Sequence, residues 1–170
     1  ERGTRTAALQ AGQLDVAMPG ETTKTAAEQL KKALPQLVVT PVATAVTDNI
    51  IMNAKKPPFD NPKVRRAVSY AIDRRALIQA VHQGAAVLGA AMAPRPYGVW
   101  GLLDKDLAAL PGYGKTEDMK ARARTLLAEA GITPQNPLRV EMATRAIAIY
   151  VDMASFVINE LKQVGIDLQV

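Results

Sequence analysis

The sequence predicts an α/β domain, and three features support this fold class. The last third of the chain reads as a strand, an amphipathic helix and a second strand. Residues 61–84 place apolar side chains at helical spacing in two successive segments. Hydrophobic residues make up 48% of the 170 residues and aromatic residues only 4%, so aliphatic side chains must fill the core that this length allows.

The first fifty residues predict two helices and three extended segments. The stretch "TAALQAG" is typical of a short helix that ends at Gly12, and "LDVAM" (residues 14–18) reads as a strand. A second helix is expected over residues 23–34, which place their apolar side chains on one face. Residues 37–46 and 48–53 are rich in β-branched and apolar side chains and are expected to be extended.

Residues 61–84 predict a helical hairpin. Asn61 is a favourable N-cap, and Pro62 fits the first helical position, where its missing N–H costs nothing. Asp73 can cap the second helix, and Gly84 is a typical end. The expected buried faces are Val64, Ala67, Val68, Ala71 and Ile72 in the first helix, and Ala76, Leu77, Ala80 and Val81 in the second.

A long connection and another helix follow. Residues 85–114 are rich in Pro and Gly, and connections of this length usually serve a function or cover another surface. Thr116 is expected to cap a helix with Glu117 and Asp118 in its first turn, where carboxylates favour the helix dipole. That helix is expected to end at Gly131.

The carboxyl-terminal residues predict a βαβ unit. "LRVEMAT" alternates apolar and polar side chains, residues 147–164 form one amphipathic helix ending at Gly165, and "IDLQV" alternates again. Two strands joined through one helix are expected to be parallel.

Few residues offer catalytic or metal-binding chemistry. The chain has no cysteine, no phosphate-binding glycine motif and one histidine, His82, near a predicted helix end where a capping or surface role is favoured. Ser69 and Ser155 lie inside predicted helices, outside any nucleophile-elbow context. Asp104 and Asp106 are spaced like metal ligands but lack further oxygen donors nearby. We therefore expect neither an enzyme nor a bound cofactor or metal.

A basic run over residues 55–75 raises the alternative of a nucleic-acid-binding helical hairpin. The net charge of +5 permits an anionic partner without requiring one. A DNA-reading pair needs a polar, outward recognition face, whereas the second helix here is mainly aliphatic. A solvated polar face is favoured, and the hairpin is interpreted as scaffold.

Both ends of the chain suggest a fragment of a larger protein. The sequence opens on Glu1 rather than Met and closes on a strand pattern. No apolar run approaches the roughly 18–20 residues that span a membrane, and no signal peptide is recognised. We expect any signal peptide to lie outside the fragment.

The stretch "NAKKPPFDNPKVRRAVSYAIDRRALIQAVHQGAA" closely resembles the signature region of family 5 solute-binding proteins of ABC transporters, the dipeptide, oligopeptide and nickel-binding group. "TAALQAGQLDVA" is similar to another family segment, with Gln13 where an acid is usual. "ARARTLLAEAGI" and the last 32 residues, from "RVEMAT" to "IDLQV", also resemble family segments in the right order. The signature positions that fit are Asn53, Pro57, Pro58, Phe59, Asp60, Val64, Arg65, Ala67, Ala71, Ile72, Asp73, Arg74 and Gly84.

The resemblance implies one lobe of a class II periplasmic binding protein-like fold, in which two lobes close on a ligand. Residues 1–50 would cross from the other lobe, and residues 51–170 would form most of the second. The implied function is capture of a peptide, nickel complex, oligosaccharide or opine in the periplasm and delivery to the ABC permease. A monomer is expected, with no nucleic-acid partner and membrane contact only through the permease.

The long connection supplies three candidate ligand-binding residues. The segment "APRPYGVWG" carries Arg95, Tyr97 and the single tryptophan, Trp100. Such a loop can line the cleft, with Trp100 stacking on the ligand. In the alternative interpretation, Tyr97 and Trp100 pack the loop onto their own lobe.

Arg145 is the fourth candidate. It is expected in the first turn of the last helix, directly after Thr144 as N-cap, where a cation opposes the helix dipole unless an anion binds there. The resemblance implies that an arginine at this strand-to-helix junction meets the ligand's carboxylate. In the alternative interpretation, Arg145 is solvated and pairs with Glu141 or Asp152.

Overall fold

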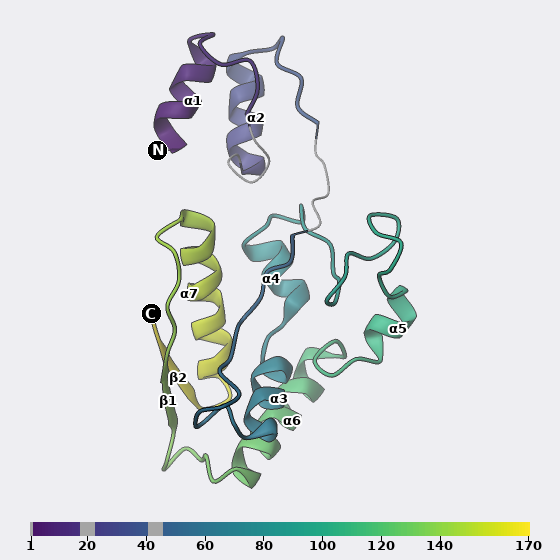
Figure 1. The fold of residues 1–170 in the computed structure, drawn as a ribbon, viewed down its shortest axis with the longest axis vertical. Helices are drawn as coiled ribbons and strands as arrows, with labels where there is room; N and C mark the ends of the chain where they lie inside the picture. The colour runs from purple at the N-terminus through teal and green to yellow at the C-terminus, as the bar shows by residue number, and fades with distance from the viewer. Residues whose placement is uncertain (1, 18–22, 41–45) are drawn as a thin grey trace.

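The computed structural model describes residues 2–17, 23–40 and 46–170. Helices α1 and α2 lie side by side, apart from a larger group formed by the remaining elements (Figure 1). None of the described helices is long and apolar enough to cross a membrane. The elements are α1 (Arg2–Gln10), α2 (Lys24–Ala33), α3 (Pro62–Ala71), α4 (Arg74–Ala80), α5 (Asp104–Ala108), α6 (Thr116–Glu129), β1 (Leu138–Glu141), α7 (Ala148–Lys162) and β2 (Ile166–Gln169).

The carboxyl-terminal βαβ unit is confirmed. Strands β1 and β2 pair in parallel, with Leu138 opposite Ile166 and Val140 opposite Leu168. Ile166 and Leu168 are buried while the intervening polar residues of β2 are exposed, because successive side chains of a strand point to opposite faces. Helix α7 contributes Val157 and Leu161 to the same core as Ile166, so one face of the sheet is covered by the helix that connects its strands.

Helices α3 and α6 form the main helix pair of the larger group (Figure 1). Ala67, Ala71 and Ala123 are completely buried, and their small side chains let the two helices approach closely. Val64 and Leu127 are each 1% exposed, and burial of such a side chain contributes about 1.5–3 kcal/mol. The predicted buried face of the first hairpin helix is therefore confirmed.

Two of the four predicted N-caps, Asn61 and Asp73, are confirmed. The Asn61 side chain accepts a hydrogen bond from the Lys63 backbone N–H at 2.9 Å, and Asp73 Oδ1 accepts one from the Ala76 N–H at 2.9 Å. The prediction for Thr116 was wrong, because Lys115 is the N-cap residue and makes no side-chain cap. The Thr116 hydroxyl instead donates to Asp73 Oδ2 at 2.5 Å, a partner far away in sequence.

Helix α4 is shorter and more exposed than predicted. It ends at Ala80, and none of its residues is buried, so the expected apolar face was wrong for this helix. The main partner of α3 is α6 rather than α4, so the hairpin helices follow one another without forming a packed pair. The helical spacing of apolar residues predicted a buried face for α4, but burying that face requires another element packed against it.

The amino-terminal part agrees with the sequence in its helices but not in its strands. Helix α2 begins after Thr23, whose hydroxyl accepts a hydrogen bond from the Ala26 N–H at 3.3 Å. Leu34 is the C-cap residue of this helix. Residues 14–17 form no strand, and Met18 lies outside the described residues. Residues 37–40 and 46–53 are in no strand, while residues 41–45 are not described. β-branched side chains favour an extended backbone, but a ladder also requires a neighbouring strand.

Candidate functional site

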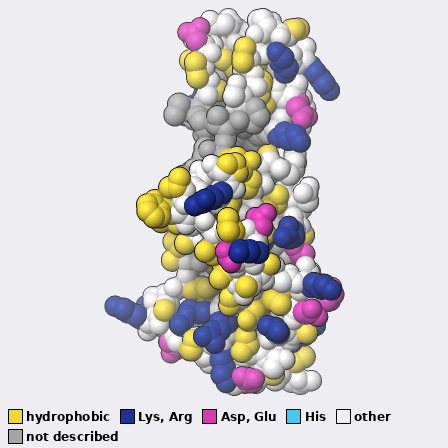
Figure 2. All heavy atoms as spheres, turned by 90° about the vertical axis from the view of Figure 1, so that its right-hand side faces the viewer, with side chains coloured by type: hydrophobic (Ala, Val, Ile, Leu, Met, Phe, Trp, Pro, Cys, Tyr) yellow, Lys and Arg dark blue, Asp and Glu magenta, His cyan; other side chains and the backbone are white. Residues whose placement is uncertain are grey.

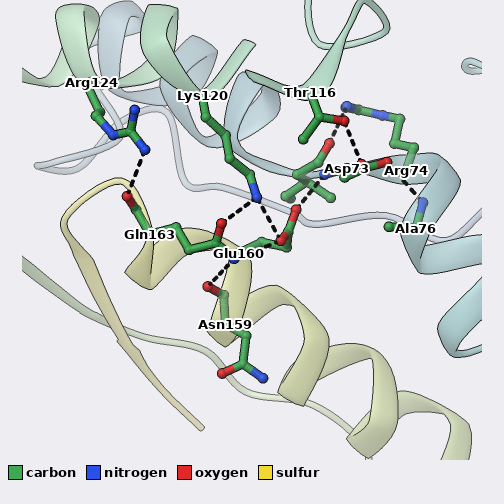
Figure 3. Close-up of polar contacts among 10 residues, drawn as sticks. Asp73, Arg74, Ala76, Thr116, Lys120, Arg124, Asn159, Glu160 and Gln163 are labelled. Atoms are coloured by element: carbon green, nitrogen blue, oxygen red, sulfur yellow. Dashed lines mark hydrogen bonds and ion pairs between the residues drawn. The ribbon is translucent and has the colours of Figure 1, made fainter. Parts of the chain in front are cut away.

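A polar network joins α3, α4, α6 and α7 around Asp73 (Figure 3). The backbone N–H of Asp73 donates to Glu160 Oε2 at 2.8 Å. The Asp73 carboxylate accepts hydrogen bonds from Ala76 and Thr116 with its two oxygens. Asp73 therefore holds the start of α4 against α6 and α7, because its side chain bonds to Thr116 of α6 and its backbone to Glu160 of α7.

The centre of this network is a buried ion pair. Lys120 Nζ lies 2.9 Å from Glu160 Oε1, and the two side chains are only 7% and 9% exposed. Gln163 accepts from Lys120 at 2.6 Å and donates to Glu160 at 3.0 Å, so both charges have further hydrogen bonds. A buried ion pair can be stable when the other hydrogen-bonding groups of both side chains also have partners, whereas burying either charge alone would cost free energy. Lys120 and Glu160 thus hold α6 to α7.

The same contacts set the ionisation of Asp73. Burial acts to raise the pKa of Asp73, but hydrogen bonds from the Thr116 hydroxyl and the Ala76 and Arg75 N–H groups, with the charge of Lys120, lower this pKa below the ordinary 3.8. These donors favour the charged form of the carboxyl group. Asp73 is therefore a structural carboxylate, ionised at neutral pH.

Arg74 anchors the end of the long connection to α3. Its guanidinium donates to the carbonyl oxygens of Ser69 at 2.9 Å and Gly112 at 2.8 Å, and it stacks over the Tyr113 ring at 4.5 Å. A Cβ at Gly112 would lie 2.5 Å from the Ser69 carbonyl oxygen, and this residue has a φ of +86°. Only glycine fits there without a shift of the backbone.

Lys63 and Arg65, two residues of the basic run, contact other groups of this chain. Lys63 pairs with Glu129 at 2.9 Å, and Arg65 donates to the carbonyl oxygens of Phe59 at 2.6 Å and Asp60 at 3.0 Å. Guanidinium groups that hold backbone carbonyls have fewer donors free for phosphate. These contacts favour scaffold over a nucleic-acid interface.

The long connection exposes its predicted aromatic residues. Trp100 is 82% exposed and Tyr97 is 53% exposed, so the Trp100 ring makes little contact with the described residues, whereas about half of Tyr97 is covered. Arg95 is also exposed. Figure 2 shows hydrophobic side chains at the surface of this part of the molecule, and the large ones exposed here are Val87, Met92, Tyr97, Val99, Trp100, Leu102 and Leu103.

Arg145 lies outside α7, so the prediction of a first-turn position was wrong. The helix begins at Ala148, after Ile147, and Thr144 is not its N-cap. The Arg145 guanidinium lies over the Tyr150 ring at 5.0 Å. Arg145 is exposed, and neither Glu141 nor Asp152 forms an ion pair with it among the described residues.

The four candidates do not form one site within this chain. The connection before α7 and the loop before α5 lie on opposite sides of the larger group, along its edge toward α1 and α2 (Figure 1). Neither a pocket of about 80 Å³ beside Asp73, Arg74 and Tyr113 nor an open one of about 340 Å³ beside Arg66 and Arg122 includes any of the candidates.

Sequence reasoning missed the Lys120–Glu160 pair. Both residues interrupt apolar faces: Lys120 shares a helix face with Ala123 and Leu127, and Glu160 lies between Val157 and Leu161. A charged residue at a core position of each of two neighbouring helices is the signal that could have predicted the pair.

The chain matches known proteins over its entire length. Residues 1–170 match the family described as "Bacterial extracellular solute-binding proteins, family 5 Middle". The glutathione-binding protein GsiB of Escherichia coli O1:K1 is 30% identical over 170 residues, which are 100% of this chain and 30% of that protein. GsiB of Salmonella typhimurium is 34% identical over 131 residues, 77% of this chain and 23% of GsiB. The heme-binding protein A of Haemophilus influenzae is 42% identical over 82 residues, 48% of this chain and 13% of that protein.

Solved structures share the fold. OppA of Haemophilus influenzae in complex with RPPGFSPFR is 25% identical, with 99% of this chain and 33% of that chain covered and a TM-score of 0.73. MppA in its unliganded open form is also 25% identical, with 99% and 32% covered and a TM-score of 0.58. The predicted class II periplasmic binding protein-like fold is confirmed, although the chain spans only about a third or less of these relatives. The match over all 170 residues shows that the chain belongs to family 5 of the bacterial extracellular solute-binding proteins.

Proposed function

We propose that the protein containing this chain is the substrate-binding component of an ABC transporter. It captures a peptide or similar small solute in a cleft between two lobes and delivers it to the membrane permease, acting as a monomer in the periplasm. The observation that carries this proposal is the family match over residues 1–170. Relatives named for glutathione, and a peptide complex of OppA, favour a peptide-like solute.

The two-lobed organisation is supported by where the core lies. Residues 51–170 form most of one lobe, and residues 1–50 cross to it from the other. The main core of buried residues runs from Ala67 to Leu168, and the half-buried side chains packed on it begin at Met52. Helices α1 and α2 lie apart from this core (Figure 1).

The proposed solute-facing residues are Arg145, Arg95, Tyr97 and Trp100. They belong to two segments on the edge of the larger group that faces α1 and α2 (Figure 1). Arg145 can donate to a carboxylate, a charge-assisted hydrogen bond stronger than a neutral one. Trp100 offers a large exposed ring for stacking on an apolar or aromatic part of the solute.

The direct test is to identify what the full-length protein binds. Small molecules that co-purify with it are released by denaturation and identified by mass spectrometry. Calorimetry with glutathione and with RPPGFSPFR then measures binding by the purified, solute-free protein. We expect a peptide-like solute to be released or one of these probes to bind. Release of no solute, together with no heat of binding for either probe, would contradict the proposal.

A further inference from the structure

Three polar contacts join the amino-terminal segment to the end of α4. The Thr25 hydroxyl donates to Gln83 Oε1 at 2.7 Å, and Lys24 Nζ donates to the Gln83 carbonyl oxygen at 3.5 Å. Asp48 Oδ2 lies 3.0 Å from His82 Nε2, in contact by distance but without hydrogen-bond alignment. The start of α2 therefore reaches α4 across the space between the two groups of elements (Figure 1).

Gln83 has a backbone conformation that side chains rarely adopt. After α4, the Gly84 N–H donates to the Ile78 carbonyl oxygen at 3.0 Å, and Gln83 has a left-handed backbone with a φ of 53°. Glycine usually occupies this position because a side chain strains the backbone there. Helix stability alone would therefore favour glycine, whereas only a side chain such as glutamine can reach Thr25.

The whole chain superposes better on a peptide-bound relative than on an unliganded open one. The TM-score is 0.73 against OppA with its peptide and 0.58 against unliganded open MppA, at the same 25% identity and the same 99% coverage of this chain. The score over the whole chain depends on how residues 1–50 sit relative to residues 51–170.

We propose that Lys24, Thr25, Asp48, His82 and Gln83 form a closure latch between the two lobes, an inference that rests on the proposed two-lobed receptor. The latch forms when the lobes close and breaks when they open, without touching the solute. A contact present in only one of two states shifts the equilibrium toward that state. Loss of the Thr25–Gln83 hydrogen bond should weaken solute binding about threefold to tenfold, through a smaller closed population.

A cross-link in the full-length protein tests the latch without any ligand. Residues 1–170 contain no cysteine, so Thr25→Cys with Gln83→Cys introduces one defined pair into this stretch. A short bismaleimide should link this pair in high yield and leave the control pair, Thr40→Cys with Gln135→Cys, unlinked. In X-ray scattering without solute, the linked protein should have a smaller radius of gyration than the same unlinked variant. A yield equal to that of the control pair, or equal radii, would overturn the latch.

Gln83→Gly separates the latch from a structural role at the helix end. This variant removes the side chain but relieves the left-handed strain, so the melting temperature should stay equal or rise. Hydrogen exchange in the full-length protein should nevertheless become about twofold to tenfold faster over residues 23–34 than in the control Gln135→Gly. Unchanged exchange there would contradict the latch. Failure of the solute-binding test with successful cross-linking would refute the receptor instead.

Discussion

Residues 51–170 and residues 2–40 differ in how much of their packing lies within the chain. The larger group buries side chains from α3, α6, α7 and β2 in one continuous core. Before Val64, the buried hydrophobic residues of the described chain are Leu9 and Leu30 alone. Val16 and Val38 are 78% and 83% exposed, although their apolar side chains favour burial. The comparison teaches that one group can fold from its own contacts, whereas the other depends on contacts made elsewhere.

The largest expected effect tests what holds the larger group together. Lys120→Ala leaves Glu160 buried without its main counter-charge, so the free energy of unfolding should fall by about 3–5 kcal/mol. Urea denaturation followed by circular dichroism measures the change. Lys162→Ala, on an exposed position of α7, is the matched control and should change stability little. A loss of less than about 1 kcal/mol for Lys120→Ala would show that the pair is not needed.

A pair of leucine truncations compares the two groups directly. Leu127→Ala opens a cavity between α3 and α6 and should cost about 2–5 kcal/mol of stability. Leu30→Ala removes a side chain that is 4% exposed but belongs to α2, and it should leave the unfolding midpoint of the larger group unchanged. Equal shifts of that midpoint in both variants would mean that the two groups unfold together.

Arg145→Ala sharpens the comparison at the edge that we propose faces the solute. Loss of its charge-assisted hydrogen bond should weaken binding of an anionic peptide by about 1.5–3 kcal/mol in the full-length protein. The melting temperature without solute should not change, because the side chain is exposed. Arg139→Ala, at an exposed arginine of β1, is the control. Calorimetry giving the same affinity for both variants would remove Arg145 from the site.

The smallest effect concerns the helix start at Asp73. Its pKa is lowered in the folded protein, so the carboxylate stabilises the fold above the ordinary value of 3.8 and this contribution is lost as the pH falls through and below that value. Asp73→Ala should cost about 0.5–2 kcal/mol at neutral pH through loss of the N-cap. The variant should also lose less stability than the wild type on acidification. Denaturation curves of both proteins at pH 7 and pH 3 measure this difference, and parallel losses would contradict it.

Local chemistry explains what could be predicted from the sequence. Asn61 and Asp73 were recognised as N-caps because their bonding partners lie two or three residues away. The βαβ unit was recognised because alternation in β2 and helical spacing in α7 report burial directly. The family resemblance was recognised because its signature is contiguous in the sequence.

The remaining features depend on partners that are distant in sequence. Thr116 has a cap-forming side chain, but Asp73 takes its hydroxyl, and no local pattern shows this contact. Of the strand predicted over residues 14–18, the described residues 14–17 form none, because β-propensity describes a pleated, half-buried surface rather than an isolated segment. The last helix was predicted to start too early: Arg145 was placed in its first turn, but the helix begins three residues after it. The role proposed for Arg145, like that proposed for Trp100, depends on a solute and on a second lobe.

Hydrogen exchange of residues 1–170, followed by mass spectrometry, tests most directly whether the two groups differ in their self-contained packing. Slow exchange should be confined to α3, α6, α7 and β2, whose side chains share the core, because local stability follows buried contacts. Amides of α1 and α2 should exchange much faster in this chain. They should become protected in the full-length protein, where the rest of the other lobe is present. Protection of α2 equal to that of α6 in the 170-residue chain would contradict the account.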